Sequence, residues 1–341
     1  MASSRTQQPR SPSIRDVARI AGVSHQTVSR VLNNHVSIRE ETRDRVLAAM
    51  AELQYRPSAA ARALSTSRSK TIGVLASRRA TYGPSRSIQA IEEAARERGY
   101  FVTSSSVTEA DEASLRAALA NLIDQDIEAL VVIAPQQHVF ETIADLAPRV
   151  PYITMRALAT GDPTALRVDE MAGARMATRH LVELGHESIR HLAGPRDWIE
   201  AEARMQGFLQ ELTARDLPVA VPVLGDWTAE FGYRAGMELL HWRDTTAYFC
   251  SNDAMAIGLM HAARDLGLDV PGDVSIVGYD DVPEAAHLWP PLTTVRQDFA
   301  EMGRRCITTL LGDGDVPAPS SRGGSARGRA APAPRRRRAA S

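Results

Sequence analysis

Two successive series of alternating strand-like and helix-like segments begin at Thr71. Apolar runs typical of buried strands cover residues 71–77, 101–106, 128–134, 150–155, 188–194, 220–224, 246–251 and 274–279. Apolar residues at helical spacing mark helices near 88–99, 172–185, 200–213, 229–240 and 254–267. Because parallel strands need crossover helices, this alternation predicts parallel sheets with helices on both faces. The expected fold is α/β, with two doubly wound subdomains at about 70–165 plus 298–312 and about 166–297.

The ends of the predicted strands are where such a fold holds ligands, because its crevice opens at the carboxyl ends of the strands. Asn252 and Asp280 follow two of these strands and can reach the crevice. Both side chains can hydrogen-bond hydroxyl groups. No G-x-G-x-x-G segment, the signature of dinucleotide binding, follows a strand. The sequence therefore predicts a small-molecule site without a cofactor.

Three short helical blocks between residues 14 and 53 precede this core. Their apolar residues are Val17, Ala18 and Ala21, then Val28, Val31 and Leu32, then Val46, Leu47, Met50 and Leu53. Gly22 lies between the first two blocks, where a tight turn needs a permissive backbone. Ser24 is suited to cap the second helix. The arrangement predicts a helix-turn-helix unit.

The outer side of the second helix carries side chains that match chemical groups on DNA. They are Ser24, His25, Gln26, Thr27, Ser29, Arg30 and Asn33. Arginine can bridge O6 and N7 of guanine, and glutamine can bridge N6 and N7 of adenine. The hydroxyl residues can bond phosphates. The alternative is a small helical bundle with a solvated polar face. The charge of the segment helps to distinguish the two interpretations.

Charge is strongly segregated along the chain, although the net charge is −1. Residues 1–69 hold eleven Lys and Arg against five Asp and Glu, and residues 313–341 hold seven Arg against two Asp. The rest of the chain carries a formal charge of −12. A basic head on an acidic body indicates a polyanionic partner for the head, which favours the DNA-binding interpretation.

The segment GVSHQTVSRVLNNHVSIREETRDRVLAAMAELQYRPSAAARALS (22–65) resembles the headpiece of the LacI/GalR family of bacterial transcriptional regulators. The resemblance implies a disordered tail at 1–12, a DNA-binding domain at 13–57, and a hinge helix and linker at 58–69. The hinge helix is expected to fold on operator DNA against its dimer partner. Leu64 then falls at a minor-groove wedge, where an apolar side chain can kink the duplex, and Arg62 can contact phosphate. A packed leucine and a solvated arginine are the alternatives.

The resemblance continues through HLVELGHESIRHLAGP (180–195), SNDAMAIGLMHAARDLG (251–267) and residues 270–303. It implies a core like that of periplasmic sugar-binding proteins, with an effector held between the subdomains. Carboxylates, amides and arginine bind sugar hydroxyls, and aromatic faces pack against C–H groups. Each candidate could instead cap a helix or fill the core. The implied effector-binding residues are Ser77, Asp169, Arg204, Trp227, Asn252, Asp280 and Phe299.

These features predict a sequence-specific transcriptional regulator, expected to be a repressor. It would bind a near-palindromic operator as a homodimer and respond to a small-molecule effector, a sugar or sugar derivative. The sequence has neither a run of eighteen apolar residues nor a secretory signal, and Cys250 and Cys306 read as buried free thiols. We therefore expect a cytoplasmic, nucleoid-associated protein without enzymatic activity, cofactor, metal site or membrane partner.

Two other classes of protein fit part of the pattern. A solute receptor would use the same core, but its basic head would have no role and it would need a secretory signal. An enzyme on an α/β core would need a nucleophile elbow, a phosphate loop or a metal motif, and the sequence contains none of them.

The C-terminal residues 313–341 depart from the family pattern, in which an apolar strand follows the position of Leu311. Here the chain is rich in Pro, Gly, Ser, Ala and Arg, and such a segment cannot bury enough surface to order itself. We expect a disordered tail, an open sheet edge in the second subdomain and at most a dimer. Either the tail is the product of an altered reading frame that leaves the core incomplete, or the arginines at 335–338 add non-specific phosphate contacts.

Overall fold

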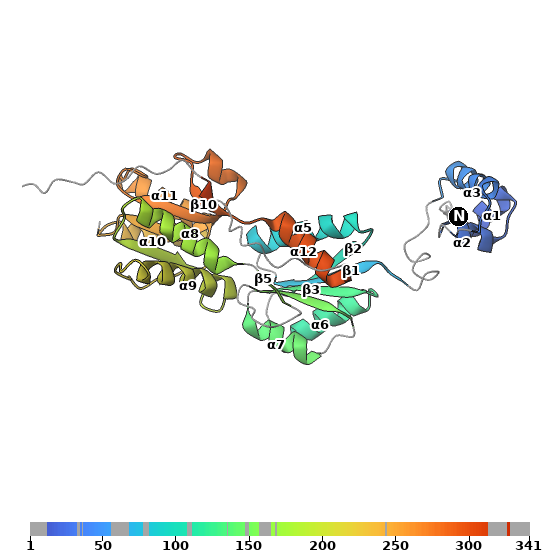
Figure 1. Cartoon of the computed structure of the whole chain (residues 1–341), viewed down its shortest axis with the longest axis horizontal. Helices are drawn as coiled ribbons and strands as arrows, with labels where there is room; N and C mark the ends of the chain where they lie inside the picture. The colour runs from blue at the N-terminus through green and yellow to red at the C-terminus, as the bar shows by residue number, and fades with distance from the viewer. Residues whose placement is uncertain are drawn as a thin grey trace, which may run out of the picture. The chain divides into compact units, whose positions relative to one another are not determined.

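The computed structural model of the chain (Figure 1) divides into two compact units, residues 1–70 and 71–341. It describes residues 12–32, 35, 37–55, 68–77, 82–107, 111–134, 136–146, 150–156, 165–167, 169–242, 244–312 and 326–327. The expected N-terminal tail up to residue 11, the hinge helix at 58–65 and most of the C-terminal tail lie outside these residues.

The described part of the first unit contains α1 (Ile14–Ala21), α2 (His25–Leu32) and α3 (Glu40–Glu52). Val17, Val28 and Val46 are completely buried between them. The predicted core is confirmed with one exception, because Leu47 is 50% exposed and Ala49 is buried. Ala49 lies three residues after Val46 and shares its helix face, whereas the next residue along the chain points elsewhere.

The turn between α1 and α2 depends on two residues. Gly22 ends α1 in the left-handed conformation, with φ of 64°, where a side chain would be strained. The Oγ of Ser24 accepts a hydrogen bond of 3.1 Å from the N–H of Thr27 at the start of α2. The predicted roles of Gly22 and Ser24 are therefore confirmed.

The first sheet of the second unit has the strand order β2–β1–β3–β4–β5, and all of its pairs are parallel in the described residues. The strands are β1 (Thr71–Ser77), β2 (Phe101–Val107), β3 (Ala129–Ile133), β4 (Tyr152–Arg156) and β5 (Ala165–Arg167). One face is covered by α5 (Tyr82–Glu97) and α12 (Phe299–Leu311), and the other by α6 (Glu112–Ile123) and α7 (Gln137–Leu146) (Figure 1).

The second sheet has the order β11–β10–β9–β8–β6–β7 in the described residues. Its strands are β6 (Ile189–Ala193), β7 (Val223–Leu224), β8 (Ala247–Cys250), β9 (Ser275–Asp280), β10 (Thr293–Arg296) and β11 (Ala326–Arg327), with a short 3-10 helix, η1 (Pro283–His287), between β9 and β10. One face is covered by α8 (Glu170–Glu183) and α9 (Ile199–Thr213), and the other by α10 (Ala229–Leu239) and α11 (Asp253–Asp265). The predicted doubly wound α/β fold is thereby confirmed.

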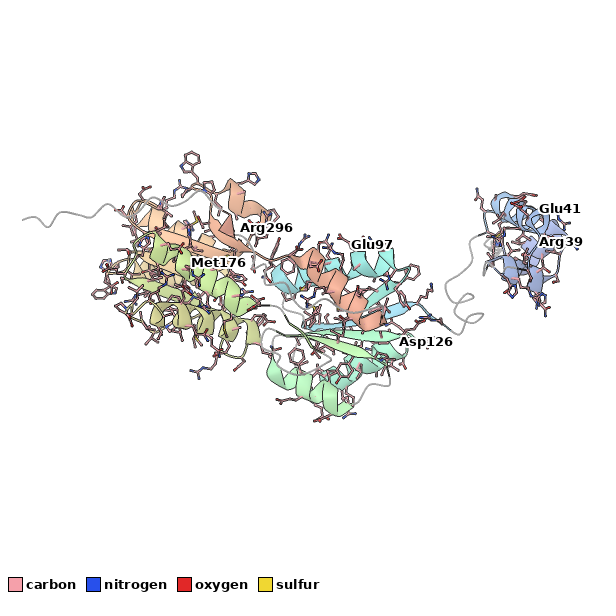
Figure 2. The ribbon with its side chains drawn as sticks, viewed as in Figure 1. Arg39, Glu41, Glu97, Asp126, Met176 and Arg296 are labelled. Atoms are coloured by element: carbon pink, nitrogen blue, oxygen red, sulfur yellow. The ribbon has the colours of Figure 1, made fainter. Side chains whose placement is uncertain are left out.

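The chain crosses from the first sheet to the second between β5 and α8, and returns after β10. Arg296 is the last residue of β10, where the chain leaves the second sheet (Figure 2). The returning helix α12 packs against α5 of the first subdomain. A Cβ on Gly303 would lie 2.5 Å from the carbonyl oxygen of Ala90, so this close approach of the two helices requires glycine.

The helix α5 begins at Tyr82, six residues before the start that apolar spacing indicates. Pro84 lies in its first turn, where the missing N–H is not needed for an intrahelical hydrogen bond. The sequence GPS therefore reads as a loop but forms the start of a helix. This earlier start places Gly83 and Ser87 where the second unit contains a cavity.

The edge of the second sheet differs from the prediction. The residues of β11 pair antiparallel with β10, Arg327 opposite Thr294 and Ala326 opposite Val295. The prediction of an open edge is therefore wrong at these two residues. Backbone N–H and C=O groups on an edge can pair with any non-proline segment, so the tail needs no apolar run to cover part of the edge.

Both cysteines are buried and free, as predicted. Burial raises the pKa of the Cys306 thiol to about 12, which keeps it protonated and unreactive at neutral pH. Among the described residues, no helix is long and apolar enough to cross a membrane.

Candidate functional site

The solvent side of α2 presents several of the predicted DNA-binding side chains. His25, Gln26 and Arg30 are exposed, and Thr27 and Ser29 are half-buried. Since Gln26 and Arg30 are four residues apart, they lie on one face of the helix. The arrangement allows one glutamine and one arginine to reach neighbouring base edges in a single major groove.

Ser24 and Thr27 have a local role in addition to the predicted contact with DNA. Their hydroxyl groups are hydrogen-bonded to each other at 2.9 Å, which adds to the cap of α2 and holds both at the N-terminal end of the helix. The remaining predicted DNA contacts, Asn33, Arg62 and Leu64, lie outside the described residues, and their roles stay predictions.

A cavity of about 680 Å³, counted with its open mouth, lies in the second unit between its two subdomains. The first subdomain contributes a mainly apolar wall that includes Pro84, Ile133, Met155, Phe299 and Met302. The second contributes a polar and aromatic wall that includes Glu170, Trp198, Glu200, Arg204, Trp227, Asn252 and Asp280. The volume is that of a site for a small organic ligand.

Arg204, on α9, lies at the centre of the polar wall and is 5% exposed. Its Nε donates to Oε2 of Glu170 at 2.8 Å, its Nη1 donates to the carbonyl oxygen of Ser251 at 2.5 Å, and its Nη2 lies 3.8 Å from Oδ1 of Asp280. The guanidinium also stacks 3.9 Å from the ring centroid of Tyr279. Burial lowers the pKa of Arg204, but Glu170 and Asp280 raise it by more, so the group stays charged.

Asp280 ends β9 with φ of 121°, a conformation that side chains rarely adopt. Its Oδ1 accepts a hydrogen bond of 3.1 Å from Nε2 of Gln297. Burial raises the pKa of Asp280 to about 8, although Arg204 opposes this shift. Strained backbone of this kind persists where its surroundings hold it, and it is common at ligand sites.

Trp227 is also held in a strained conformation, with φ of 71°. Nδ2 of Asn252 donates to its carbonyl oxygen at 3.0 Å, while Oδ1 of Asn252 caps α11 by accepting from the N–H of Met255. Asn252 therefore has both the predicted place in the cavity wall and the alternative role of a cap.

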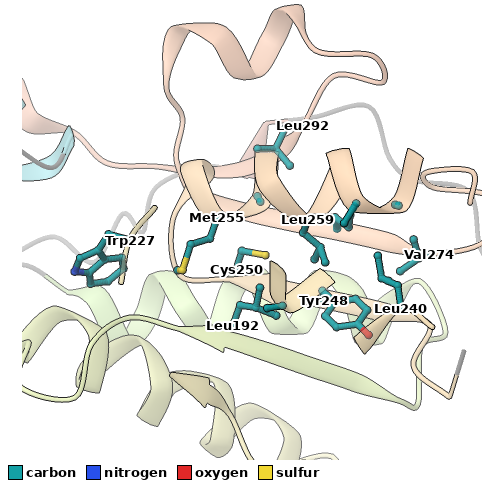
Figure 3. Close-up of a cluster of buried hydrophobic side chains, with 14 of the residues drawn as sticks. Leu192, Trp227, Leu240, Tyr248, Cys250, Met255, Leu259, Val274 and Leu292 are labelled. Carbon is teal, nitrogen blue, oxygen red and sulfur yellow. The ribbon is translucent and has the colours of Figure 1, made fainter. Parts of the chain in front are cut away.

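The indole ring of Trp227 stands at the end of a buried cluster, with its nitrogen directed away from Met255 and Cys250 (Figure 3). It meets the ring of Trp198 edge to face, with 5.4 Å between the ring centroids. Its Nε1 is buried and has no hydrogen-bond partner among the described residues. A buried indole N–H normally has a partner, so a ligand in the cavity is a candidate acceptor.

Five of the seven predicted effector-binding residues line this cavity: Arg204, Trp227, Asn252, Asp280 and Phe299. Asp169 is not among the lining residues. It is exposed, and its Oδ1 caps α8 by accepting from the N–H of Ala172 at 3.0 Å, a usual role for an aspartate before a helix. The side chain of Ser77 lies outside the described residues.

Sequence reasoning missed Glu170, Trp198, Glu200 and Gln297, which also line the cavity. Glu170 and Glu200 both stand in the first turn of a helix, where an acidic residue is ordinarily explained by the helix dipole. Gln297 precedes Asp298, the N-cap of α12. Their positions at helix starts therefore concealed their positions in the wall.

Comparison with known proteins agrees with this arrangement. Residues 13–58 match the model of bacterial regulatory proteins of the lacI family, and residues 178–322 match a periplasmic binding protein-like domain. The lactose operon repressor of Escherichia coli (strain K12) is 36% identical over 298 residues, which are 87% of this chain and 83% of that protein. This chain belongs to the LacI family. The resemblance that the sequence indicated is confirmed, and the LacI-family chain is a DNA-binding transcriptional regulator.

Solved structures of similar proteins cover nearly the whole LacI-family chain. A lac repressor dimer bound to operator and the anti-inducer ONPF is 34% identical, with a TM-score of 0.81 over 89% of this chain and 94% of that one. A complex of the transcriptional regulator CelR with cellobiose is 28% identical, with a TM-score of 0.64 over 90% and 95% of the two chains.

Proposed function

We propose that this protein is a repressor that binds a near-palindromic operator, and that a sugar or sugar derivative in the cavity changes its affinity for that operator. The observation that carries this proposal is that both subdomains line the cavity. A ligand held between two subdomains favours the arrangement it binds better, and so can shift the population of DNA-binding states. The names of the relatives support the ligand class, since one is a lactose operon repressor and another is bound to cellobiose.

The proposed assembly is a homodimer, because two-fold symmetry pairs two headpieces with the two halves of a near-palindrome. The similar lac repressor structure is a dimer on its operator. On this chain Trp289 is 97% exposed and Trp242 is 77% exposed. Tryptophan is enriched in protein interfaces, so these two side chains mark candidate contacts with a second copy.

We further propose that the protein binds its effector without converting it and acts in the cytoplasm on nucleoid DNA. The repressor identity of its relatives supports binding rather than catalysis. Mass spectrometry of ligand eluted after long incubation should recover the compound unchanged, whereas a product would indicate an enzyme.

Capture of genomic fragments on the purified protein, followed by sequencing with and without candidate sugars, tests the function. We expect enrichment of a near-palindromic motif and a change in its enrichment with at least one sugar. A solute receptor or an enzyme on the same core would enrich no motif.

Arg30→Ala is expected to reduce operator affinity by about 1–3 kcal/mol and to relax base preference at one position in each half-site. The reason is that the exposed arginine of α2 can bridge two acceptors of guanine. Selection of bound sequences from a randomised operator pool measures both effects. Arg19→Ala, at an exposed arginine of α1, is the matched control and should leave base preference unchanged. An equal loss on all sequences for Arg30→Ala would identify Arg30 as a phosphate contact.

Replacing the four arginines at 335–338 with glutamine is expected to flatten the salt dependence of DNA binding. For every arginine that no longer neutralises a phosphate, the slope of log affinity against log salt should fall by about 0.9. These substitutions leave the β11 residues in place, whereas deletion of residues 317–341 also uncovers β10. A normal slope in the glutamine variant would remove the DNA role of the tail, and an unchanged melting temperature in the deletion variant would show that β11 adds no stability.

A further inference from the structure

The described wall of the cavity carries more acidic than basic side chains. In the part of the chain that the structure describes, Glu170, Glu200 and Asp280 contribute three carboxyl groups, and Arg204 is the lining residue with a cationic side chain. Buried charges are stable only when they are paired or hydrogen-bonded. Burial raises the pKa of Glu200 to about 7 and that of Asp280 to about 8. A cationic group in the cavity would favour their ionised forms, so the cavity favours positive charge in its occupant.

The cation of Arg204 is already used by its neighbours. Its Nε is bound to Glu170, its Nη1 to the Ser251 carbonyl, and its Nη2 lies near Asp280. The same guanidinium stacks on Tyr279. These contacts fix its orientation toward two of the three carboxyl groups, and no hydrogen bond joins it to Glu200 among the described residues.

Glu200 is consequently the carboxyl group with an oxygen that lacks a partner. Its Oε2 is shielded from solvent and has no hydrogen-bond partner among the described residues, yet the side chain lines the cavity. Burial raises its pKa to about 7. Native proteins seldom leave a buried carboxyl oxygen unsatisfied without a functional reason. Glu202, two residues away, instead accepts a hydrogen bond from Nε2 of Gln206 at 2.9 Å.

We propose that the effector is an amino sugar, and that Glu200 determines this specificity by receiving its ammonium group. The inference rests on the proposed function, because it names the ligand class of the same cavity. Trp198 and Trp227 add aromatic faces to the wall beside Glu200, and such faces attract cations as well as sugar C–H groups. Phosphorylated and carboxylated sugars are expected to bind weakly, because Arg204, the cation of the described wall, is already paired with Glu170.

Calorimetry on the full chain tests the proposal with glucosamine, galactosamine and mannosamine, each compared with its parent hexose. Glucose 6-phosphate and glucuronate serve as anionic probes. At least one amino hexose is expected to bind about tenfold or more tightly than its parent, the difference that a charge-assisted hydrogen bond supplies. Glu200→Gln should bring this ratio close to one, and the matched control Glu202→Gln should keep it.

Proton release provides a second readout that a structural role would not produce. The charged groups that act on Glu200 are Glu170 and Arg204, and those that act on Asp280, on the same wall, are Arg204, Asp253 and Glu170. At pH 6 the free protein holds a proton on Glu200, because its pKa is about 7, and an ammonium ligand favours the ionised form. Titrations in buffers of different ionisation enthalpy should therefore show about one proton released per ligand bound, and Glu200→Gln should abolish this release.

Three results would overturn the inference: no amino hexose binds, the parent hexose binds as tightly as its amine, or Glu200→Gln leaves the ratio unchanged. If a neutral sugar binds and changes operator affinity, the proposed function stands and the amine specificity fails. If no sugar of any charge changes operator affinity, both fail.

Discussion

Arg204→Ala is expected to abolish the response to effector while operator binding survives. The substitution leaves Glu170 and Asp280 buried without their shared cation. Loss of one partner from a buried charged pair costs about 2–5 kcal/mol, enough to disorganise the polar wall and to erase a modest coupling between effector and operator. Because α2 belongs to the separate first unit, its operator contacts need not change.

Two measurements on the same preparation check this expectation: calorimetry for the ligand, and fluorescence anisotropy on labelled operator with and without ligand. Arg175→Ala is the matched control. Arg175 is a half-exposed arginine of α8 whose Nε bonds Glu211 at 3.1 Å, away from the cavity lining. Normal ligand affinity in both Arg204→Ala and Asp280→Ala would refute the pocket.

Gly258→Ala is expected to destabilise the second unit strongly. A Cβ at this position would lie 1.9 Å from the carbonyl oxygen of Ala229 and 2.6 Å from the backbone nitrogen of Tyr233. Both atoms belong to the backbone of α10, so α10 and α11 must move apart. Overpacking of this kind costs about 3 kcal/mol, which lowers the melting temperature by roughly 6–12 °C in a unit of this size.

Differential scanning calorimetry follows the transition of the second unit, and Gly83→Ala is the matched control. A Cβ on Gly83 meets no atom within 4 Å outside its chain neighbours, and its contact with Pro84 is only a local strain, so this variant should lose far less stability than Gly258→Ala. Equal melting temperatures for Gly258→Ala and the parent chain would show that the two helices do not pack as closely as described.

In the headpiece, the local pattern of residues predicts the helices and most of the buried side chains. Apolar spacing, the glycine of the turn and the capping serine are all contained in residues 14–54, and the three helices follow from them. Leu47 is exposed although it stands beside Val46 within an apolar run, so the pattern places it wrongly in the core. Only the direction in which α3 faces α1 and α2 decides which of two neighbouring apolar residues is buried.

In the cavity, the local pattern of residues predicts only some of the lining side chains. Asn252 and Asp280 were predicted because they follow strands, and Arg204, Trp227 and Phe299 because of the family resemblance. Glu200 has neither signal, and its role depends on Trp198, Asp280 and Arg204 lying on the same wall. Trp198, Glu200 and Arg204 share the start of α9, but Asp280 comes from β9, so the proximity of Glu200 to Asp280 exists only in the folded subdomain.

The sequence by itself determined the helix-turn-helix head and the doubly wound α/β core. The periods of apolar residues and the placement of Gly22 and Ser24, which predict them, are local properties of the chain. It also determined the basic character of the head and the acidic character of the core. The tertiary structure alone decided that the tail residues Ala326 and Arg327 cover part of a sheet edge, since backbone pairing leaves no side-chain pattern. It also decided which carboxyl groups share one arginine and which one keeps an unpartnered oxygen, because the energy of a buried charge depends on its neighbours in space.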